Sequence, residues 1–243
     1  YNDFVAYGNI NSALGYLSSD INLKFDPARK KEYYKGHLAT NRFDVGKLLG
    51  VANLGALSMT ADVDGSGLRI DNMETKMKGA VSLLQYGGYD YNSINVNGEI
   101  SKKLFDGKLV VAEPNLDMMF NGQIDFQEEI PVFDFTADIN RLLPDKLKLI
   151  DLPGAAEISS QMEINFSGNT PDNWEGEVQV NNLNYKADKT LYHINNISLA
   201  SDLDSLSRGI HITSDFMDGD LNGRFEFKSL KEAFIQLVPE FFP

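Results

Sequence analysis

A seven-residue pattern of the form apolar-x-Gly-x-apolar-x-apolar recurs along this chain, with mostly polar residues at x. Full copies stand at residues 77–83, 105–111, 120–126, 174–180 and 221–227, and shorter versions surround Gly36 and Gly98. Side chains of a strand alternate between the two faces of a sheet. Each copy therefore predicts a half-buried strand whose apolar face lacks one side chain, at the glycine. A notched apolar face of this kind is either a protein core or a binding surface.

Short alternating runs, separated by turn residues such as Asp26-Pro27 and Gly87-Gly88, fill most of the chain. This pattern is typical of antiparallel meanders. The expected strands are 21–25, 34–40, 57–63, 68–70, 77–83, 91–101, 105–111, 116–126, 133–139, 158–166, 176–185, 192–200, 209–214 and 220–227. The sequence predicts a mostly β fold: a long antiparallel meander sheet folded into a trough, or into a flattened barrel or sandwich, with a few short helices at its ends.

Helical patterns are few. Residues 43–49 place Val45, Leu48 and Leu49 on one stripe, and residues 139–143, before a proline, repeat this element in shorter form. Near the C-terminus, residues 229–238 combine capping-box spacing with an apolar stripe. These segments are either plugs against the open ends of the sheet or ordinary connections.

The length of 243 residues permits one large all-β domain or two smaller ones. We expect a single repetitive β domain over 1–243, with sub-units at 1–75, 76–150 and 151–243. The chain begins with tyrosine, and it contains neither an apolar run of about 18 residues nor a signal-peptide pattern. The expectation is therefore a fragment of a larger parent chain, whose anchor lies elsewhere.

Charge and cysteine content exclude several classes of function. The chain has 22 basic and 35 acidic residues, a net charge of -13 and no cysteine. Phosphate binding requires concentrated positive charge, so a nucleic-acid partner is not expected. The basic cluster Arg29-Lys30-Lys31 is interpreted as a solvated loop. Disulfides, thiolate metal sites and thiol catalysis are absent, because they require cysteine.

The sequence offers few candidates for catalysis or for a metal site. His37, His193 and His211 have no second ligand at metal-binding spacing and are interpreted as exposed strand residues. Residues 62–67, Asp-Val-Asp-Gly-Ser-Gly, resemble the start of a calcium loop, but Met73 occupies the twelfth position, which requires glutamate. A turn between two strands explains this segment without a metal. We expect no metal and no cofactor.

Two acidic pairs, Glu128-Glu129 and Glu175 with Glu177, are the candidates for glycoside hydrolysis. That reaction needs two carboxyl groups facing each other, one of them with a raised pKa. Nothing in the sequence places either pair in this way, so a non-catalytic protein is expected. The tyrosine-rich turn at residues 86–91 is interpreted either as a contact for a sugar or a membrane interface, or as a packed hairpin corner.

The recurring Phe-x-Gly-x-Ile-x-Phe strands resemble the AsmA-like proteins. The same holds for residues 137–143 after a strand, for their counterpart at 41–50, and for the closing Gly223-Arg224-Phe225 strand before a short helix. Within the superfamily the chain is most similar to the TamB type, the translocation and assembly module of the Gram-negative envelope. The resemblance extends from about Ile21 to Pro239. This chain differs in lacking the N-terminal anchor and the C-terminal membrane-interacting domain.

The resemblance implies a long sheet folded lengthwise into a trough, located in the periplasm and held by an inner-membrane anchor of the parent. It also implies a role in phospholipid passage between membranes or in outer-membrane assembly. It brings no catalytic residues and no cofactor. The implied partners are lipid acyl chains and envelope assembly proteins, with membrane contact through parts of the parent that are absent here.

The apolar phase of the strands supplies the candidate lining of a lipid groove. These residues are Leu38, Val81, Leu83, Ile100, Leu109, Val111, Phe120, Ile124, Phe126, Val178, Val180, Phe225 and Phe227. One interpretation is that the in-phase glycines widen the trough. The other is that they mark bends or bulges in a closed sandwich.

A second function, a surface β-sandwich adhesion or carbohydrate-binding module, is the alternative. Such a module should carry aromatic residues on loops or on a solvent-facing side. Here the aromatic residues keep the apolar phase, which favours the lipid-handling protein; they are Phe105, Phe120, Phe126, Trp174, Phe225 and Phe227.

Overall fold

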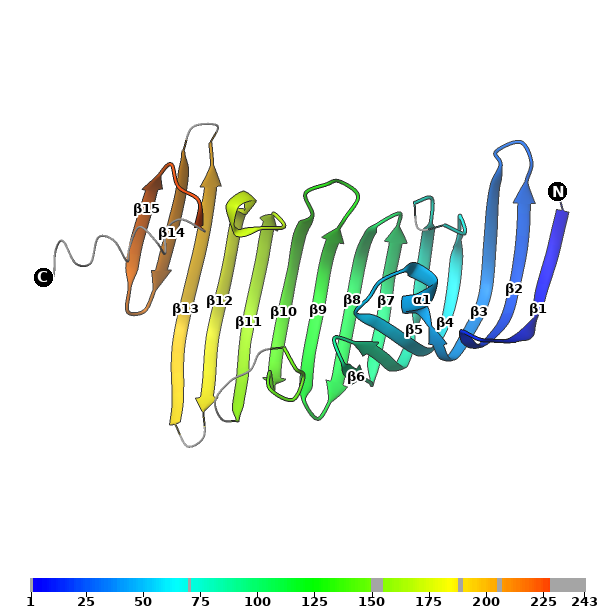
Figure 1. The fold of residues 1–243 in the computed structure, drawn as a ribbon, viewed down its shortest axis with the longest axis horizontal. Coiled ribbons are helices and arrows are strands. Elements are labelled where there is room, and N and C mark those ends of the chain that lie inside the picture. The colour runs from blue at the N-terminus through cyan, green and yellow to red at the C-terminus, as the bar shows by residue number, and fades with distance from the viewer. Residues whose placement is uncertain (1, 70, 150–154, 188–189, 205–206, 228–243) are drawn as a thin grey trace, which may run out of the picture.

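Fifteen antiparallel strands form one sheet, in which the chain runs as a meander from β1 to β15 (Figure 1). The computed structural model describes residues 2–69, 71–149, 155–187, 190–204 and 207–227. The strands are β1 Asn2–Ser12, β2 Gly15–Asp26, β3 Lys31–Asp44, β4 Leu54–Ser66, β5 Glu74–Tyr86, β6 Tyr89–Tyr91, β7 Ile94–Ser101, β8 Leu104–Glu113, β9 Leu116–Asp125, β10 Val132–Leu142, β11 Ala156–Ser167, β12 Glu175–Ala187, β13 Thr190–Leu203, β14 Arg208–Ser214 and β15 Asp218–Gly223. Neighbours in sequence pair throughout, except that β6 pairs only with β5 and β5 pairs on with β7. The predicted long antiparallel meander is confirmed.

The strand predictions differ from the structure at several places, and the predicted strand 91–101 is interrupted between β6 and β7. β1 was not predicted, although it pairs with β2 over its whole length. An edge strand is held mainly by backbone hydrogen bonds, so its sequence need not show a clear apolar alternation. β4 continues through Gly65 to Ser66, where a turn was expected. Leu68 and Arg69 lie in a bend instead of a new strand.

The helix predictions are confirmed in one case and wrong in another. Helix α1, Val45–Leu49, begins where the Asp44 side chain accepts a hydrogen bond from Lys47 N and ends at left-handed Gly50. It packs against β4. No helix forms at 139–143, because β10 continues to Leu142 through a bulge after Ile139. The helix predicted at 229–238 lies outside the described residues.

The register separates an apolar face from a polar one. Direct cross-strand partners share a face, and one continuous row of partners runs from β3 to β13. We call it the floor row: Leu38, Ala61, Gly79, Val96, Leu109, Phe120, Ala137, Met162, Val180 and Ile197. Its side of the sheet is the inner face. The adjoining row on the opposite, outer face includes His37, Asp62, Lys78, Asn97 and Lys108.

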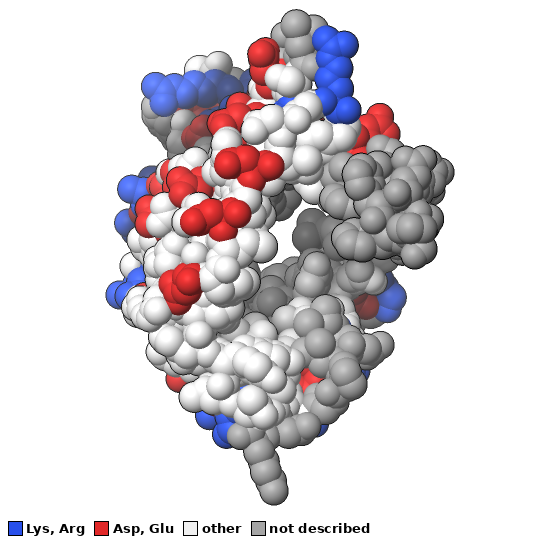
Figure 2. All heavy atoms as spheres, turned by 90° about the vertical axis from the view of Figure 1, so that its left-hand side faces the viewer, with Lys and Arg blue, Asp and Glu red and all other residues white. Residues whose placement is uncertain are grey.

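A line of β-bulges bends the strands at similar heights. The register shifts after Thr40 in β3, between Ser58 and Met59 in β4, after Ile139 in β10 and after Ser159 in β11. A bulge kinks its strand and strengthens the local twist. Seen end on, the described atoms curve around a hollow, with acidic and basic side chains gathered on the outside of the curve (Figure 2).

Candidate functional site

The inner face is the candidate site, because it gathers most of the predicted lining residues. The register places nine of them there: Leu38, Val81, Ile100, Leu109, Val111, Phe120, Ile124, Val178 and Val180. Four belong to the floor row, in which Ala61, Val96, Phe120 and Ala137 are buried. The sheet therefore presents one connected apolar surface along the trough.

The other four predicted lining residues lie on the outer face or beyond the ends of the strands. Leu83 pairs with Ser58, whereas Val81 pairs with Met59, so the bulge at Ser82 turns Leu83 to the outer face. Phe126 follows the end of β9 and is exposed. Phe225 and Phe227 lie beyond the last strand, which ends at Gly223. The strand predicted for residues 220–227 is therefore too long.

The glycines of the repeated pattern do not widen the trough. Gly98, Gly107 and Gly122 are direct partners on β7, β8 and β9. At Gly122 the φ angle is 143°, and an added Cβ would lie 2.5 Å from the Cα of Phe135 on the next strand. Glycine is thus required by the close approach of two backbones. The register runs without a bulge through Gly98, Gly107 and Gly122, so these glycines mark close backbone approaches.

Aromatic rings close over the glycine positions. Phe105 and Phe120 flank Gly107 and Gly122 on the inner face, and their ring centroids are 6.1 Å apart. Phe120 and Phe135 are 4.8 Å apart. An added Cβ on Gly98 would approach the Phe105 ring to 3.0 Å. Neighbouring side chains therefore occupy the space that the glycines leave in the middle of the sheet.

A second aromatic group follows the inner face from β9 to β12. Successive ring centroids in the series Phe126, Phe133, Phe166 and Trp174 lie 5.9, 4.8 and 5.8 Å apart. Such tilted and edge-on pairs stabilise beyond their buried area. Of this series, the repeated pattern contains only Phe126 and Trp174. The alternation of apolar and polar residues predicted Phe133 and Phe166 as strand residues.

The inner face keeps an open groove over β2 to β7. Its volume is about 400 Å³, and its lining includes Ile21, Leu23, Tyr34, Leu38, Met59, Val63, Met77 and Ile100. The Tyr34 hydroxyl contacts Thr75 Oγ1 and donates to the carbonyl oxygen of Gly67. The hydroxyl is therefore satisfied, and the groove offers an apolar surface to a ligand. Only Leu38 and Ile100 were predicted as lining; Ile21, Leu23 and Met59 lie in runs whose alternation was visible but which contain no glycine pattern.

Part of the inner face is covered by a lid, which we define as residues 87–91, with β6, together with residues 143–149, the lid loop. In the lid loop, Leu147 is 2% exposed and packs with Ile94, Val111 and Leu116. Lys148 Nζ donates to the carbonyl oxygen of Gly88 and so joins the two parts. The tyrosine-rich turn thus forms a packed hairpin corner, with Tyr89 and Tyr91 against this cluster.

A carboxyl group is buried beneath the lid. Glu113, the last residue of β8, is 3% exposed. Its Oε2 accepts a hydrogen bond from Asn92 Nδ2 at 2.8 Å, whereas its Oε1 has no hydrogen-bond partner. Burial raises the pKa of Glu113, and the nearby Tyr89 hydroxyl offsets this only in part. No sequence pattern indicates this site, because Glu113 differs from surface glutamates only in its surroundings.

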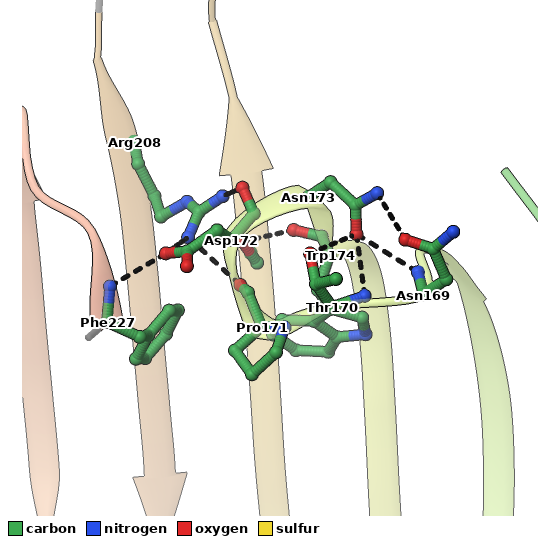
Figure 3. A network of polar contacts seen from close by, with 9 residues as sticks. Asn169, Thr170, Pro171, Asp172, Asn173, Trp174, Arg208 and Phe227 are labelled. Atoms are coloured by element: carbon green, nitrogen blue, oxygen red, sulfur yellow. Dashed lines mark hydrogen bonds and ion pairs between the residues drawn. The ribbon is translucent and has the colours of Figure 1, made fainter.

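A buried cation closes the other end of the inner face (Figure 3). Arg208 of β14 is 4% exposed; it donates to the carbonyl oxygens of Pro171 and Asp172 and pairs with the Asp172 carboxylate at 3.7 Å. Pro171 and Asp172 belong to the 3-10 helix η1, Pro171–Asn173. The Phe227 amide also donates to Asp172 Oδ1, and the Arg208 guanidinium lies over the rings of Phe225 and Phe227. This cluster holds the residues that follow β15, which ends at Gly223, against β14 and η1.

Most of the charged residues considered for chemistry lie on the outer face, whereas Glu128 and Glu129 lie in the exposed loop between β9 and β10. Lys35 pairs with Asp64 at 2.7 Å and His37 with Asp62 at 3.1 Å, so side chains of the neighbouring strand contact both carboxylates of the calcium-like segment. His193 and His211 are exposed, as expected. Glu177 accepts hydrogen bonds from Gln179 and Ser198. Among the described residues, no three acidic or histidine side chains are grouped as metal ligands.

No family model, curated protein or solved structure matches this chain. In the described part of the chain, no helix has the length and apolar character needed to cross a membrane.

Proposed function

We propose that this chain is a non-catalytic envelope protein that holds or conducts lipid acyl chains along its inner face. The observation that carries this proposal is the open groove over β2 to β7, which combines a volume of about 400 Å³ with a lining of aliphatic, methionine and tyrosine side chains. Small-molecule sites are concave, mostly apolar and of this size. The groove adjoins the floor row through Leu38, so a bound chain would continue onto a connected apolar surface.

The energetics support this role. Burial of an acyl chain of about 16 carbons at ~0.8 kcal/mol per methylene yields on the order of 12 kcal/mol, enough to keep the chain out of water. Because the Tyr34 hydroxyl already has a hydrogen-bond partner, an acyl chain in the groove would not leave it unpaired. A periplasmic location, a membrane-anchored parent, and a part in phospholipid transport or outer-membrane assembly complete the proposal; they rest on the resemblance to AsmA-like proteins.

Native mass spectrometry of protein purified from cells tests the proposal. The expected result is phospholipid bound to the intact chain, reduced in the variant Met59→Glu, which places a charge in the groove. The matched control is Thr60→Glu, the next residue of β4, which faces outward. Lipid absent from the unsubstituted chain, or lost equally in both variants, would contradict the proposal.

A further inference from the structure

The lid segment that contains β6 joins β7 through a tight turn, which we call the hinge. β6 ends at Tyr91, and the chain turns through Asn92 and Ser93 into β7; Ser93 has a φ angle of 53°, in the left-handed region. Few non-glycine residues adopt this conformation. The Asn92 side chain is held by the Glu113 carboxyl, and the Ser93 carbonyl oxygen accepts from the Ala112 amide at 3.1 Å. The end of β8 therefore fixes the hinge of the lid.

The β8–β9 turn, which follows Glu113, contacts both parts of the lid. Asn115, two residues after Glu113, donates through Nδ2 to the Tyr89 hydroxyl at 2.9 Å, and its carbonyl oxygen accepts from the Leu143 amide at 2.9 Å. The lid loop and β6 thus meet at the β8–β9 turn. Beneath them lie Ile94, Val111 and Leu116, three buried residues of the inner face.

The groups that face Glu113 offer little compensation for a negative charge. They are the hydroxyl groups of Tyr89 and Tyr91 on β6, the Asn92 amide, and Arg141 on β10. Arg141 donates to the main-chain carbonyl oxygen of Glu113 at 3.5 Å, and its Nε has no partner. In the described part of the chain no ion pair joins Arg141 to the Glu113 carboxylate. A buried carboxylate with one oxygen unpaired is costly, whereas the neutral acid is tolerated.

We propose that Glu113 is a proton-controlled latch for the lid. With the proton bound, the neutral carboxyl lies in the apolar cluster and the lid covers the inner face at Ile94, Val111 and Leu116. When the proton is released to water, the charged carboxylate moves toward solvent. Its hydrogen bond to Asn92 at the hinge is lost, and the lid opens. The latch would thus control access between the groove and the rest of the inner face; that consequence rests on the proposed function, but the motion itself does not.

Distance measurement between two spin labels tests the latch on protein freed of lipid. The chain has no cysteine, so the pair Asp90→Cys on β6, the lid segment next to the hinge, and Lys108→Cys on the outer face of β8 labels only these positions. The expected result is one narrow distance distribution at acidic pH, which broadens toward longer distances as the pH rises. With Glu113→Gln the narrow distribution should persist at every pH. The exposed control Glu129→Gln should behave like the unsubstituted chain.

A second variant keeps the test decisive if Glu113→Gln does not fold. Tyr89→Phe removes a hydroxyl that favours the ionised carboxyl, so the midpoint of opening should move to higher pH. The proposal is overturned if the distances do not depend on pH, if Glu113→Gln changes with pH as the unsubstituted chain does, or if Tyr89→Phe leaves the midpoint unchanged or lowers it. Because no lipid takes part, failure of the latch would be distinct from failure of the lipid proposal.

Discussion

The rings of Phe105 and Phe120 meet across the glycine positions of β8 and β9, with 6.1 Å between their centroids. Phe105 precedes Gly107 by two residues, and Phe120 precedes Gly122 by two residues, so the two rings flank the paired glycines from opposite sides. The middle of the inner face is therefore filled by its own side chains. The apolar space left for a ligand lies to the side, over β2 to β7.

The close approach at Gly122 predicts a local intolerance of any side chain. Gly122→Ala should lower the free energy of unfolding by about 1–3 kcal/mol, because it forces a left-handed φ on alanine and a Cβ against the β10 backbone. Gly8→Ala is the control: this glycine also lies in a strand, and its added Cβ meets nothing within 4 Å. Urea unfolding of both variants checks the prediction, and an equal loss in the two would contradict it.

The buried guanidinium of Arg208 should anchor the C-terminal end of the sheet. Arg208→Met should cost about 2–3 kcal/mol, because charge-assisted hydrogen bonds to η1 are lost. Hydrogen exchange should rise in η1 and β14 before it rises in β3 or β4. The control Arg69→Met removes an 81% exposed side chain and should change neither quantity. Unchanged exchange in η1 after Arg208→Met would show that the anchor is unimportant.

Leu147 should contribute more to stability than any other position in the lid loop. Leu147→Ala removes a fully buried side chain from the cluster with Ile94 and Val111 and should cost about 2–5 kcal/mol. Leu149→Ala, two residues later, removes a side chain that is 52% exposed and should be close to neutral. Thermal unfolding of the pair tests the packing of the lid, and similar melting temperatures would argue against it.

Glu113 should make stability depend on pH in a defined direction. Its pKa is raised in the folded chain, so the folded state binds the proton more tightly than the unfolded state does. The stabilisation is fully present below the unfolded pKa of about 4.3 and is lost as the pH rises through the folded pKa. The stability of the unsubstituted chain relative to Glu113→Gln should therefore fall between acidic and neutral pH. Urea unfolding at several pH values measures this difference, and a constant difference would contradict the assignment.

Alternation of apolar and polar residues was sufficient to predict the meander and its inner face. It placed Leu38, Leu109 and Val180 correctly, because a regular strand keeps its period over many residues. It failed at Leu83, where the extra residue Ser82 forms a bulge and shifts the phase. The position of a bulge depends on the neighbouring strand, which a single sequence does not reveal.

The lid and the C-terminal anchor were not predictable for a related reason. Leu147 lies in a turn and Glu113 at a strand end, and only contacts between segments distant in sequence bury them. Arg208 precedes the predicted strand 209–214 and was not singled out, yet it is buried through contacts with η1, more than 30 residues earlier. Burial of polar side chains is a tertiary property, and pattern reasoning assigns such residues to solvent.

Site-specific photo-crosslinking in living cells tests the central claim most directly. A photoreactive residue at Leu38 or Val180 on the inner face should yield a lipid adduct, detected by the mass of the purified protein. The same residue at the neighbouring outward-facing positions Ala39 and Gln179 should yield none. Adducts confined to Leu38 and Val180 are the result that a lipid-holding trough predicts; no adduct at either position, or equal labelling of both faces, would contradict it.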